Sequence, residues 1–232
     1  MVKPYLAPFS VDLTGHSALV TGAGAEIGRA AAIALAQSGA AVLVNDINPD
    51  KADETADFIV AGGGRALPWQ ADVSNRFQVG SMIEAARDAF NRVDILVNAA
   101  GVYKRGPFDQ VDEWDWRRAL DVNLTGAFFC MQLLGRVMAE EGGGAIVNIG
   151  SVLATASNGL DGVAYVASKA GIIGLTTQSA AELAARGIRV NAIAAPPDVD
   201  DALAASIASI VLFLCSDAAR AINGQLITAS RA

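Results

Sequence analysis

The stretch from Ser17 to Gly28, with the sequence SALVTGAGAEIG, decides the fold of this 232-residue chain. A short apolar run ends at Thr21, and a glycine-rich turn leads from it into a helical pattern that begins at Ile27. Glycines let the backbone approach a phosphate closely, and the free N–H groups of a helix N-terminus favour an anion. The stretch therefore predicts a strand, a turn and a helix that hold the phosphates of a nucleotide.

Short β-branched runs alternate with helical patterns along the rest of the chain. The predicted strands are Ser17–Thr21, Ala41–Asn45, Ala66–Gln70, Ile95–Asn98, Ala145–Ile149, Arg189–Ile193 and Leu226–Thr228. The predicted helices are Ile27–Ser38, Lys51–Ala61, Asn75–Asn91, Trp114–Glu140, Tyr165–Ala185 and Ile207–Cys215. This alternation is typical of α/β proteins, in which a parallel sheet carries helices on both faces. Since no linker or repeat interrupts it, we expect a single domain over residues 1–232, with residues 1–13 as an arm ahead of the first strand.

Cap residues support several of these helix boundaries. Ser74 suits the N-cap position of the third helix, and Gly39 suits the left-handed position after the first. The run Gly142-Gly143-Gly144 separates the long middle helix from the next strand. These signals agree with the boundaries that the apolar patterns give.

Composition and charge narrow the class of protein. The formal net charge is −7 and the longest basic cluster is Arg117-Arg118, so a nucleic-acid partner is not expected. Apolar residues make up 53% of the chain, which is enough for a globular core. We therefore expect chemistry on a small molecule.

Cysteines, the histidine and the apolar segments bear on metals and on location. Cys130 and Cys215 lie inside apolar helical patterns, which indicates reduced core residues. A single histidine, His16, argues against a zinc site. The N-terminus has no apolar signal core, and Gly, Asp or Arg interrupts each apolar run before it reaches the length of a membrane span. We expect a cytoplasmic enzyme with no metal and no membrane contact.

An acidic residue follows the second predicted strand. Asp46 lies eighteen residues beyond Gly28, where a carboxylate can accept hydrogen bonds from adenosine ribose hydroxyls. It would repel a 2′-phosphate, no Arg or Lys is present in the turn or beside Asp46 in sequence, and Glu26 adds a second acid. NAD is therefore favoured over NADP. The alternative is that Asp46 is a simple loop acid.

Two further segments follow strands at their carboxyl ends, where open α/β sheets bind ligands. Asp72, after the third strand, could hold an adenine amino group. The small residues from Asn98 to Gly101, after the fourth strand, leave room for the adenosine half of a dinucleotide. Each segment could equally be a helix cap or a tight turn.

Tyr165 and Lys169 are four residues apart, so on a helix both side chains project from one face. An ammonium close to a phenol favours the phenolate, which would make Tyr165 a proton donor or acceptor near neutral pH. Ser151, fourteen residues upstream, could hydrogen-bond a substrate carbonyl or alcohol. The plainer alternative is a helix surface on which the ring packs against the lysine stem.

Together these motifs resemble the short-chain dehydrogenase/reductase family over nearly the whole chain. The matching segments are Thr21–Gly28 (TGxxxGxG), Asn98–Gly101 (NAAG), Asn123, Ser151 with Tyr165-x-x-x-Lys169, and Arg189-Val190-Asn191. The resemblance implies a Rossmann-type, doubly wound parallel sheet of about seven strands. It also implies an enzyme that transfers hydride between a nicotinamide cofactor and an alcohol or carbonyl carbon.

The resemblance gives each matching residue a role. Tyr165 would be the acid/base, Ser151 would bind the reacting oxygen, and Lys169 would lower the tyrosine pKa and hold the nicotinamide ribose. Asn123 would hold a water that links Lys169 to solvent, although it could instead bridge a helix kink. The cofactor would be bound by Gly22, Gly24, Ile27, Gly28, Asp46, Ile47, Asp72, Val73, Asn98, Ala99, Gly101, Tyr165, Lys169 and Pro196.

Three features depart from the family pattern. Glu26 occupies the second glycine of the turn, which places a carboxylate near the expected pyrophosphate. After the sixth strand the chain has Pro196-Pro197-Asp198 in place of Pro-Gly and a threonine, and only a few residues then precede the last helix. The family's longer helical lid over the substrate is therefore shortened, or omitted from the sequence. The chain also lacks the family's usual Asp-Gly-Gly ending.

The favoured function is an NAD-dependent oxidoreductase acting on a secondary alcohol or ketone. The alternatives are an NADPH-dependent 3-oxoacyl thioester reductase and a catalytically idle dinucleotide-binding scaffold. By resemblance, the helices that start at Trp114 and Tyr165 would pack against their copies in a homodimer or homotetramer. A small, mostly apolar substrate pocket is expected, with lining residues Ala154, Thr155, Leu160 and Val163, bordered by Tyr103, Arg105 and Trp116.

Overall fold

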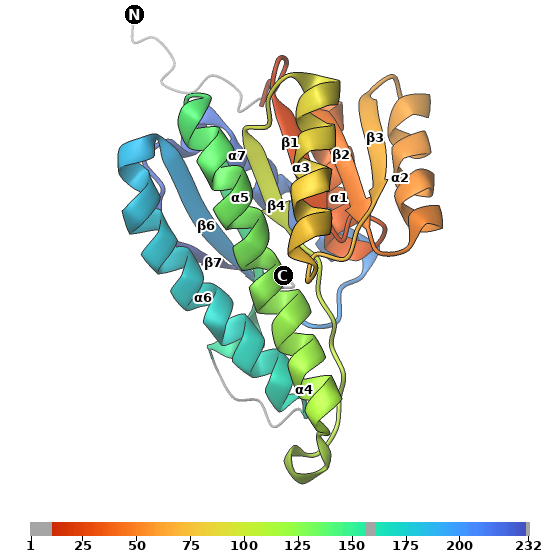
Figure 1. Ribbon diagram of the computed structural model, residues 1–232, viewed down its shortest axis with the longest axis vertical. Helices are drawn as coiled ribbons and strands as arrows, with labels where there is room; N and C mark the ends of the chain where they lie inside the picture. The colour runs from red at the N-terminus through yellow and green to blue at the C-terminus, as the bar shows by residue number, and fades with distance from the viewer. Residues whose placement is uncertain (1–10, 156–160, 231–232) are drawn as a thin grey trace, which may run out of the picture.

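The computed structural model describes residues 11–155 and 161–230, and a seven-stranded parallel sheet forms its centre (Figure 1). The strands are β1 (Ser17–Thr21), β2 (Ala41–Asp46), β3 (Arg65–Gln70), β4 (Ile95–Asn98), β5 (Gly144–Ser151), β6 (Ile188–Ala195) and β7 (Leu226–Thr228). Their order across the sheet is β3-β2-β1-β4-β5-β6-β7. The direction of winding reverses between β1 and β4, and the carboxyl ends beside such a reversal are where these sheets bind ligands.

Helices cover both faces of this sheet. They are α1 (Glu26–Gln37), α2 (Pro49–Ala61), α3 (Arg76–Phe90), α4 (Glu113–Leu120), α5 (Ala127–Glu140), α6 (Val163–Leu183) and α7 (Asp201–Cys215). Successive strand residues point to opposite faces. In β1, Ala18 and Val20 therefore pack with α1, α2 and α7, whereas Leu19 packs with α3, α5 and α6. Figure 1 looks onto the second of these faces. The expected α/β architecture is confirmed.

The long middle helix differs from the prediction. The predicted helix Trp114–Glu140 is interrupted between α4 and α5 by a π-helical segment, Asp121–Gly126. Gly126 packs tightly at the end of this segment, because a Cβ there would lie 2.7 Å from Cγ2 of Val73. The sequence pattern missed the interruption because the helical run continues on both sides of it.

The continuous run Glu113–Glu140 is long and apolar enough to cross a membrane by length and composition alone. The apolar 18-residue stretch within this run is 50% buried in the structure, and α5 packs into the core on one face of the sheet. Core helices of globular proteins meet the same two criteria, so the run is weak evidence for a membrane span.

The last helix begins earlier than predicted. α7 starts at Asp201 rather than Ile207, because the Asp200 carboxylate accepts a hydrogen bond from the N–H of Leu203 (2.9 Å) and caps the helix. The chain runs from β6 to α7 through residues 196–200 alone. No long helical segment therefore joins these two elements.

The caps of the other helices agree only in part with the sequence. Gly39 follows α1 with φ of 99°, as expected for the left-handed position. The N-cap of α3 is Asn75, whose side chain accepts a hydrogen bond from the N–H of Phe77 (3.0 Å). The assignment of Ser74 as this cap was wrong, because Ser74 instead bonds to the carboxylate of Asp72.

Both cysteines are buried free thiols, as predicted. Burial raises the pKa of Cys130 and of Cys215 to about 12, so both stay protonated. Over residues 11–155 and 161–230, no group of three or more His, Cys, Asp or Glu is placed to hold a metal ion. Most of the predicted N-terminal arm lies outside the described residues, although Leu13 is buried.

Candidate active site

The glycine-rich turn lies at the carboxyl end of β1, and close packing dictates its glycines. A Cβ on Gly22 (φ 62°) would lie 2.7 Å from Cα of Ala100, and one on Gly28 would lie 2.1 Å from the Gly22 carbonyl oxygen. The hydroxyl of Thr21 accepts hydrogen bonds from the N–H groups of Ala99 and Ala100 (both 3.2 Å). The turn is thus fixed against the end of β4.

A cavity of about 270 Å³, the central cavity, opens beside this turn. The turn, the ends of β4, β5 and β6, and the start of α6 form its walls. Its lining residues are Gly22, Ala25, Glu26, Ile27, Gly28, Asp46, Ala99, Gly101, Val102, Tyr103, Ile149, Gly150, Tyr165, Lys169, Ala195, Pro196, Pro197 and Val199. The structure therefore gathers most of the predicted cofactor residues and two predicted catalytic residues around one space.

A second, smaller cavity of about 110 Å³, the side cavity, lies between the ends of β2, β3 and β4. Ile47, Asp72, Val73 and Gly101, which were predicted to bind the cofactor, line it. Gly22 and Asp46 line both cavities, so the two spaces adjoin at the turn.

Asp46 is held at the end of β2 by backbone N–H groups. Its Oδ2 accepts from Gly24 (3.0 Å) and its Oδ1 accepts from Asn48 (3.0 Å). A Cβ on Gly24 would lie 2.6 Å from Cβ of Lys51 and 2.7 Å from Oδ2 of Asp46. The start of α2 therefore brings the stem of Lys51 back toward the turn, close to this carboxylate.

Asp72 is engaged by neighbouring side chains. Its Oδ1 accepts from the Ser74 hydroxyl (2.6 Å), and its Oδ2 forms an ion pair with Arg118 (3.0 Å). Partial burial raises the pKa of Asp72, but the hydrogen bonds from Ser74 and Arg118 outweigh it and hold the pKa below its usual value. The carboxylate therefore carries structural bonds as well as lining the side cavity.

Tyr165 and Lys169 project from the first two turns of α6 toward the end of β5. Lys169 donates a hydrogen bond from Nζ to the Ile149 carbonyl (2.7 Å) and is almost completely buried. Burial lowers the pKa of Lys169 to about 8. Its amine therefore gains or loses a proton close to neutral pH.

The Tyr165 hydroxyl hydrogen-bonds to Ser151, the last residue of β5. Burial raises the pKa of Tyr165, the bond to Ser151 lowers it, and the charges of Tyr103, Glu26 and Asp198 raise it further. The net pKa lies above its ordinary value, whereas the resemblance implies a lowered one. Burial is the largest cause. Lys169 directs its Nζ at the Ile149 carbonyl and lies 5.8 Å from the centre of the tyrosine ring.

Asn123 lies in the π-helical segment and connects it to the loop after β4. Its Oδ1 accepts from the N–H of Val102 (2.7 Å), and its Nδ2 donates to the Val102 carbonyl (3.0 Å) and the Ser168 hydroxyl (2.9 Å). A Cβ on Gly101 would lie 3.4 Å from the Asn123 Oδ1 and 3.5 Å from the Lys169 Nζ. Asn123 thus fixes the loop that passes over the lysine.

Some predicted residues lie behind the cavities rather than in them. Asn98 donates to the Asn148 side chain (2.8 Å) and joins β4 to β5. Asn123 and Ser151 are buried, and neither lines the central cavity. Of the expected substrate pocket, Leu160 lies outside the described residues.

Several functional groups were missed by sequence reasoning. The carbonyl of Ile149 anchors Lys169, and a backbone carbonyl leaves no signal in the residue type. Pro197 and Val199 line the cavity from the short connection between β6 and α7. Only the spacing between Pro196 and the last helix could have pointed to them.

A dinucleotide fits most of this site. Gly22 and Gly28 line the central cavity beside the start of α1, and the side cavity adjoins it, as a long two-part ligand requires. Glu26 is the exception, because it is the first residue of α1 and lines the central cavity with φ of 47°. A carboxylate therefore lies at the helix end that would otherwise favour a phosphate.

Comparison with known sequences defines the class of this protein. The family model for short chain dehydrogenases matches residues 16–209. The 3-oxoacyl-[acyl-carrier-protein] reductase of Synechocystis sp. is 42% identical over 184 residues, covering 78% of this chain and 74% of the relative. The D-threitol dehydrogenase of Mycolicibacterium smegmatis is 38% identical over 242 residues, covering 93% and 92%. The chain belongs to the short-chain dehydrogenase/reductase family and is an oxidoreductase that uses an NAD(P) cofactor.

Solved structures agree with this assignment. A 7α-hydroxysteroid dehydrogenase in complex with NADH and 7-oxo glycochenodeoxycholic acid has a TM-score of 0.87 and 33% identity, covering 94% of this chain and 93% of that one. A short-chain type dehydrogenase/reductase from Mycobacterium marinum has a TM-score of 0.89 and 30% identity, covering 94% of each chain. The Rossmann-type fold expected from the sequence is confirmed.

Proposed function

We propose that this enzyme transfers hydride between NAD(H) and a secondary alcohol or ketone, with Tyr165 as the acid/base. One observation carries the proposal: Tyr165 and Lys169 face the central cavity, and Ser151 bonds to Tyr165, beside the glycine-rich turn. When bound, a nicotinamide cofactor supplies or accepts the hydride. The idle-scaffold alternative is not carried further, because the family is one of oxidoreductases.

The side chains supply the proton transfer. In the reductive direction, the Tyr165 hydroxyl donates its proton to the carbonyl oxygen of the substrate, and the Ser151 hydroxyl donates a hydrogen bond to the same oxygen. Lys169, with a pKa of about 8, replaces the proton on Tyr165. Asn123 holds the Val102 backbone over this lysine. In the oxidative direction each transfer reverses.

Replacing Tyr165 with Phe tests the assignment. The rates of ketone reduction with NADH and of secondary-alcohol oxidation with NAD⁺ should each fall by about 10² to 10⁴. Cofactor binding, followed by NADH fluorescence, should change little because the glycine-rich turn is untouched. Undiminished turnover by this variant would sink the assignment.

The preference for NAD over NADP rests on Asp46, whose carboxylate lies where the adenosine ribose is expected and would repel a 2′-phosphate. Turnover with NADH and with NADPH should be compared at equal substrate concentration. A strong preference for NADPH would contradict the role given to Asp46.

A second candidate is the NADPH-dependent reduction of a 3-oxoacyl thioester. The observation that favours it is the 42% identity to the 3-oxoacyl-[acyl-carrier-protein] reductase of Synechocystis sp.. Acetoacetyl-CoA with NADPH serves as the test substrate. A rate well above that of simple ketones with NADH would replace the first candidate with the second.

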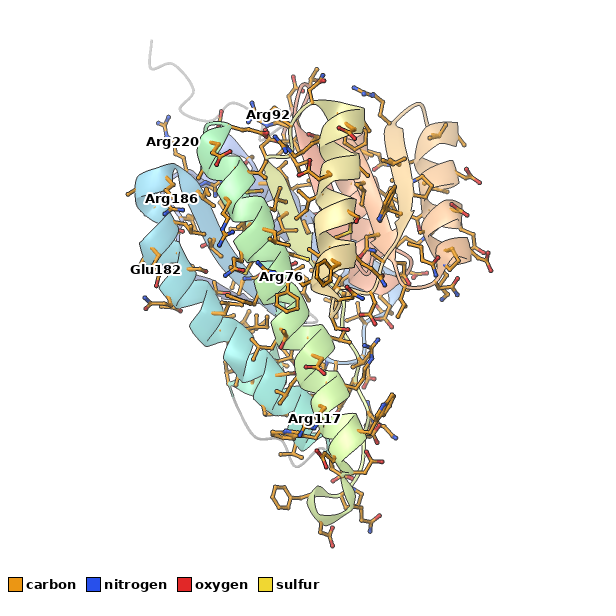
Figure 2. All side chains as sticks on the ribbon, viewed as in Figure 1. Arg76, Arg92, Arg117, Glu182, Arg186 and Arg220 are labelled. Carbon is orange, nitrogen blue, oxygen red and sulfur yellow. The ribbon has the colours of Figure 1, made fainter. Side chains whose placement is uncertain are left out.

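We also propose that the enzyme is a cytoplasmic homodimer or homotetramer. A groove of about 360 Å³ runs between α5 and α6, and Phe128, Met131 and Leu175 give it an apolar floor. Glu182, on α6, and Arg186, just beyond the end of α6, border it (Figure 2). Such a groove suits a second copy packed helix against helix, and the reduced thiols suit the cytoplasm. A monomeric mass by light scattering would contradict the oligomer.

A further inference from the structure

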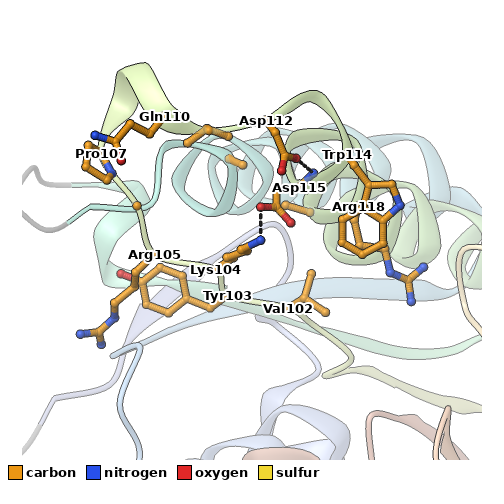
Figure 3. Close-up of a pocket in the computed structure, with 14 residues that line it drawn as sticks. Val102, Tyr103, Lys104, Arg105, Pro107, Gln110, Asp112, Trp114, Asp115 and Arg118 are labelled. Carbon is orange, nitrogen blue, oxygen red and sulfur yellow. Dashed lines mark hydrogen bonds and ion pairs between the residues drawn. The ribbon is translucent and has the colours of Figure 1, made fainter.

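Tyr103 separates the central cavity from a larger space, the outer pocket. The outer pocket has a volume of about 530 Å³ and lies between the loop after β4 and helix α4 (Figure 3). Tyr103 and Val102 line both spaces. Since Asn123 bonds to the backbone N–H and carbonyl of Val102, the start of this wall is held in place.

The ring of Tyr103 packs directly on the proposed catalytic tyrosine. The centres of the Tyr103 and Tyr165 rings are 4.3 Å apart, and their planes meet at 30°. The Tyr103 hydroxyl donates to the Asp161 carbonyl (2.9 Å). A Cβ on Gly162 (φ 132°) would lie 2.5 Å from Cε2 of Tyr103, so only glycine admits the ring here. The chain ahead of α6 is therefore shaped around this ring.

The short connection to α7 reaches the same ring through Arg105. The guanidinium of Arg105 lies 5.1 Å from the centre of the Tyr103 ring. Its Nη2 lies 2.9 Å from each carboxylate oxygen of Asp198, within residues 196–200. Three segments distant in sequence thus meet at Tyr103, beside the connection where the family's longer lid is missing.

The outer pocket suits an uncharged, apolar group. Pro107, Val111, Trp114 and Ala164 contribute apolar surface. Its cations are already paired, Lys104 with Asp115 and Arg118 with Asp72, so an anionic ligand would have to break an ion pair. Figure 3 shows the pair between Lys104 and Asp115 within the pocket.

We propose that Tyr103 is a specificity-determining residue, whose ring closes the central cavity off from the outer pocket and limits the enzyme to short secondary alcohols and ketones. The inference rests on the proposed function. Removing the ring joins the two spaces, so the longer arm of a ketone can extend between α4 and the loop after β4. A single side chain, rather than a lid, thus excludes substrates with a long arm.

The test compares the wild type with Tyr103→Ala and Tyr103→Phe on the 2-alkanones from 2-butanone to 2-decanone, with NADH. In Tyr103→Ala, the ratio of kcat/KM for 2-decanone to that for 2-butanone should rise roughly tenfold or more. Tyr103→Phe keeps the ring and should keep the wild-type ratio. A general loss of structure would lower both rates and leave the ratio unchanged.

Binding of 2-decanone to each protein, measured by ligand-observed NMR with and without NADH, gives a readout independent of turnover. Tyr103→Ala should bind it at least about fivefold more tightly than the wild type. Equal binding and equal ratios in all three proteins would overturn the inference. Tighter binding by Tyr103→Ala with no turnover by any protein would instead overturn the proposed function and leave the inference standing.

Discussion

The two ends of the central cavity are built in different ways. At the turn, the backbone forms the site, and glycines pack at distances that exclude a side chain. At the reacting end, side chains form the site, and the Tyr165 ring is held by contacts from separate segments. The turn therefore tolerates little change, whereas the reacting end can be altered one side chain at a time. This difference predicts that a substitution at the turn lowers the stability of the fold, whereas one at the reacting end can raise it.

The largest effect is expected from a side chain added at the turn. Gly28→Ala places a Cβ 2.1 Å from the Gly22 carbonyl oxygen and should destabilise the fold by about 3 kcal/mol or more. Cofactor binding should be lost with it. Gly80→Ala is the control, because a Cβ there meets nothing within 4 Å and α3 should gain stability. Thermal unfolding of both variants measures the difference in stability. Equal melting temperatures would contradict the prediction that packing at Gly28 excludes a side chain.

Removing the buried amine at the reacting end should have the reverse effect on stability. Lys169→Met should lower activity by about 10² to 10⁴, yet raise the free energy of unfolding at pH 7 by up to about 3 kcal/mol. The gain arises because burial lowers the lysine pKa from 10.5 to about 8, so charging it costs stability in the folded state. The lost bond to the Ile149 carbonyl reduces this gain.

The same shift sets the pH dependence. Below pH 8 the wild type bears the full cost of the buried charge, and between 8 and 10.5 the unfolded chain binds the proton more strongly than the folded one. The stability gap between Lys169→Met and the wild type should therefore narrow as the pH rises through this range. Urea unfolding at several pH values measures it, and a constant gap would contradict the buried charge.

A smaller effect is expected from Glu26, where the two ends meet. Glu26→Gly should tighten NADH binding about tenfold, because it removes a carboxylate from the N-terminus of α1. It should also relieve a left-handed backbone at a residue with a side chain. Glu26→Gln removes the charge alone and separates the two causes. Calorimetric titration that gives equal Kd values for all three proteins would show that the carboxylate points away from the ligand.

The smallest effect is expected at the ion pair of Arg105 and Asp198. Both side chains are largely exposed, at 51% and 75%, so their attraction is screened by water and salt. Asp198→Asn should change the free energy of unfolding by less than about 1 kcal/mol. A larger loss in thermal unfolding would show that the short connection stabilises the fold as well as lining the cavity.

How far the sequence predicted the molecule follows the same division. The turn and the strands were predictable, because glycines and apolar runs of fixed length encode backbone packing directly. The pair of Tyr165 and Lys169 was predictable from helical spacing. The direction of the Lys169 amine toward the Ile149 carbonyl was not predictable. Nor was the raised pKa of Tyr165, which follows first from burial.

Contacts between distant segments were also not predictable from the sequence. Lys51 lies five residues beyond Asp46, and only the path of the chain into α2 brings its stem back to Gly24. Asp198 and Arg105 are 93 residues apart, so no local pattern pairs them. The π-helical segment also left no trace in the apolar pattern, since the helices on both sides keep their own periodicity.

That segment has a consequence for how the chain can change. Each residue advances an α-helix by about 100°, so a single residue more or fewer within Asp121–Gly126 would turn α5 by that angle relative to α4. Asn123 would lose Val102, or Leu134 would leave the core. The π-helical segment therefore fixes the rotation of α5 relative to α4. An insertion or deletion within it should be tolerated less well than a substitution.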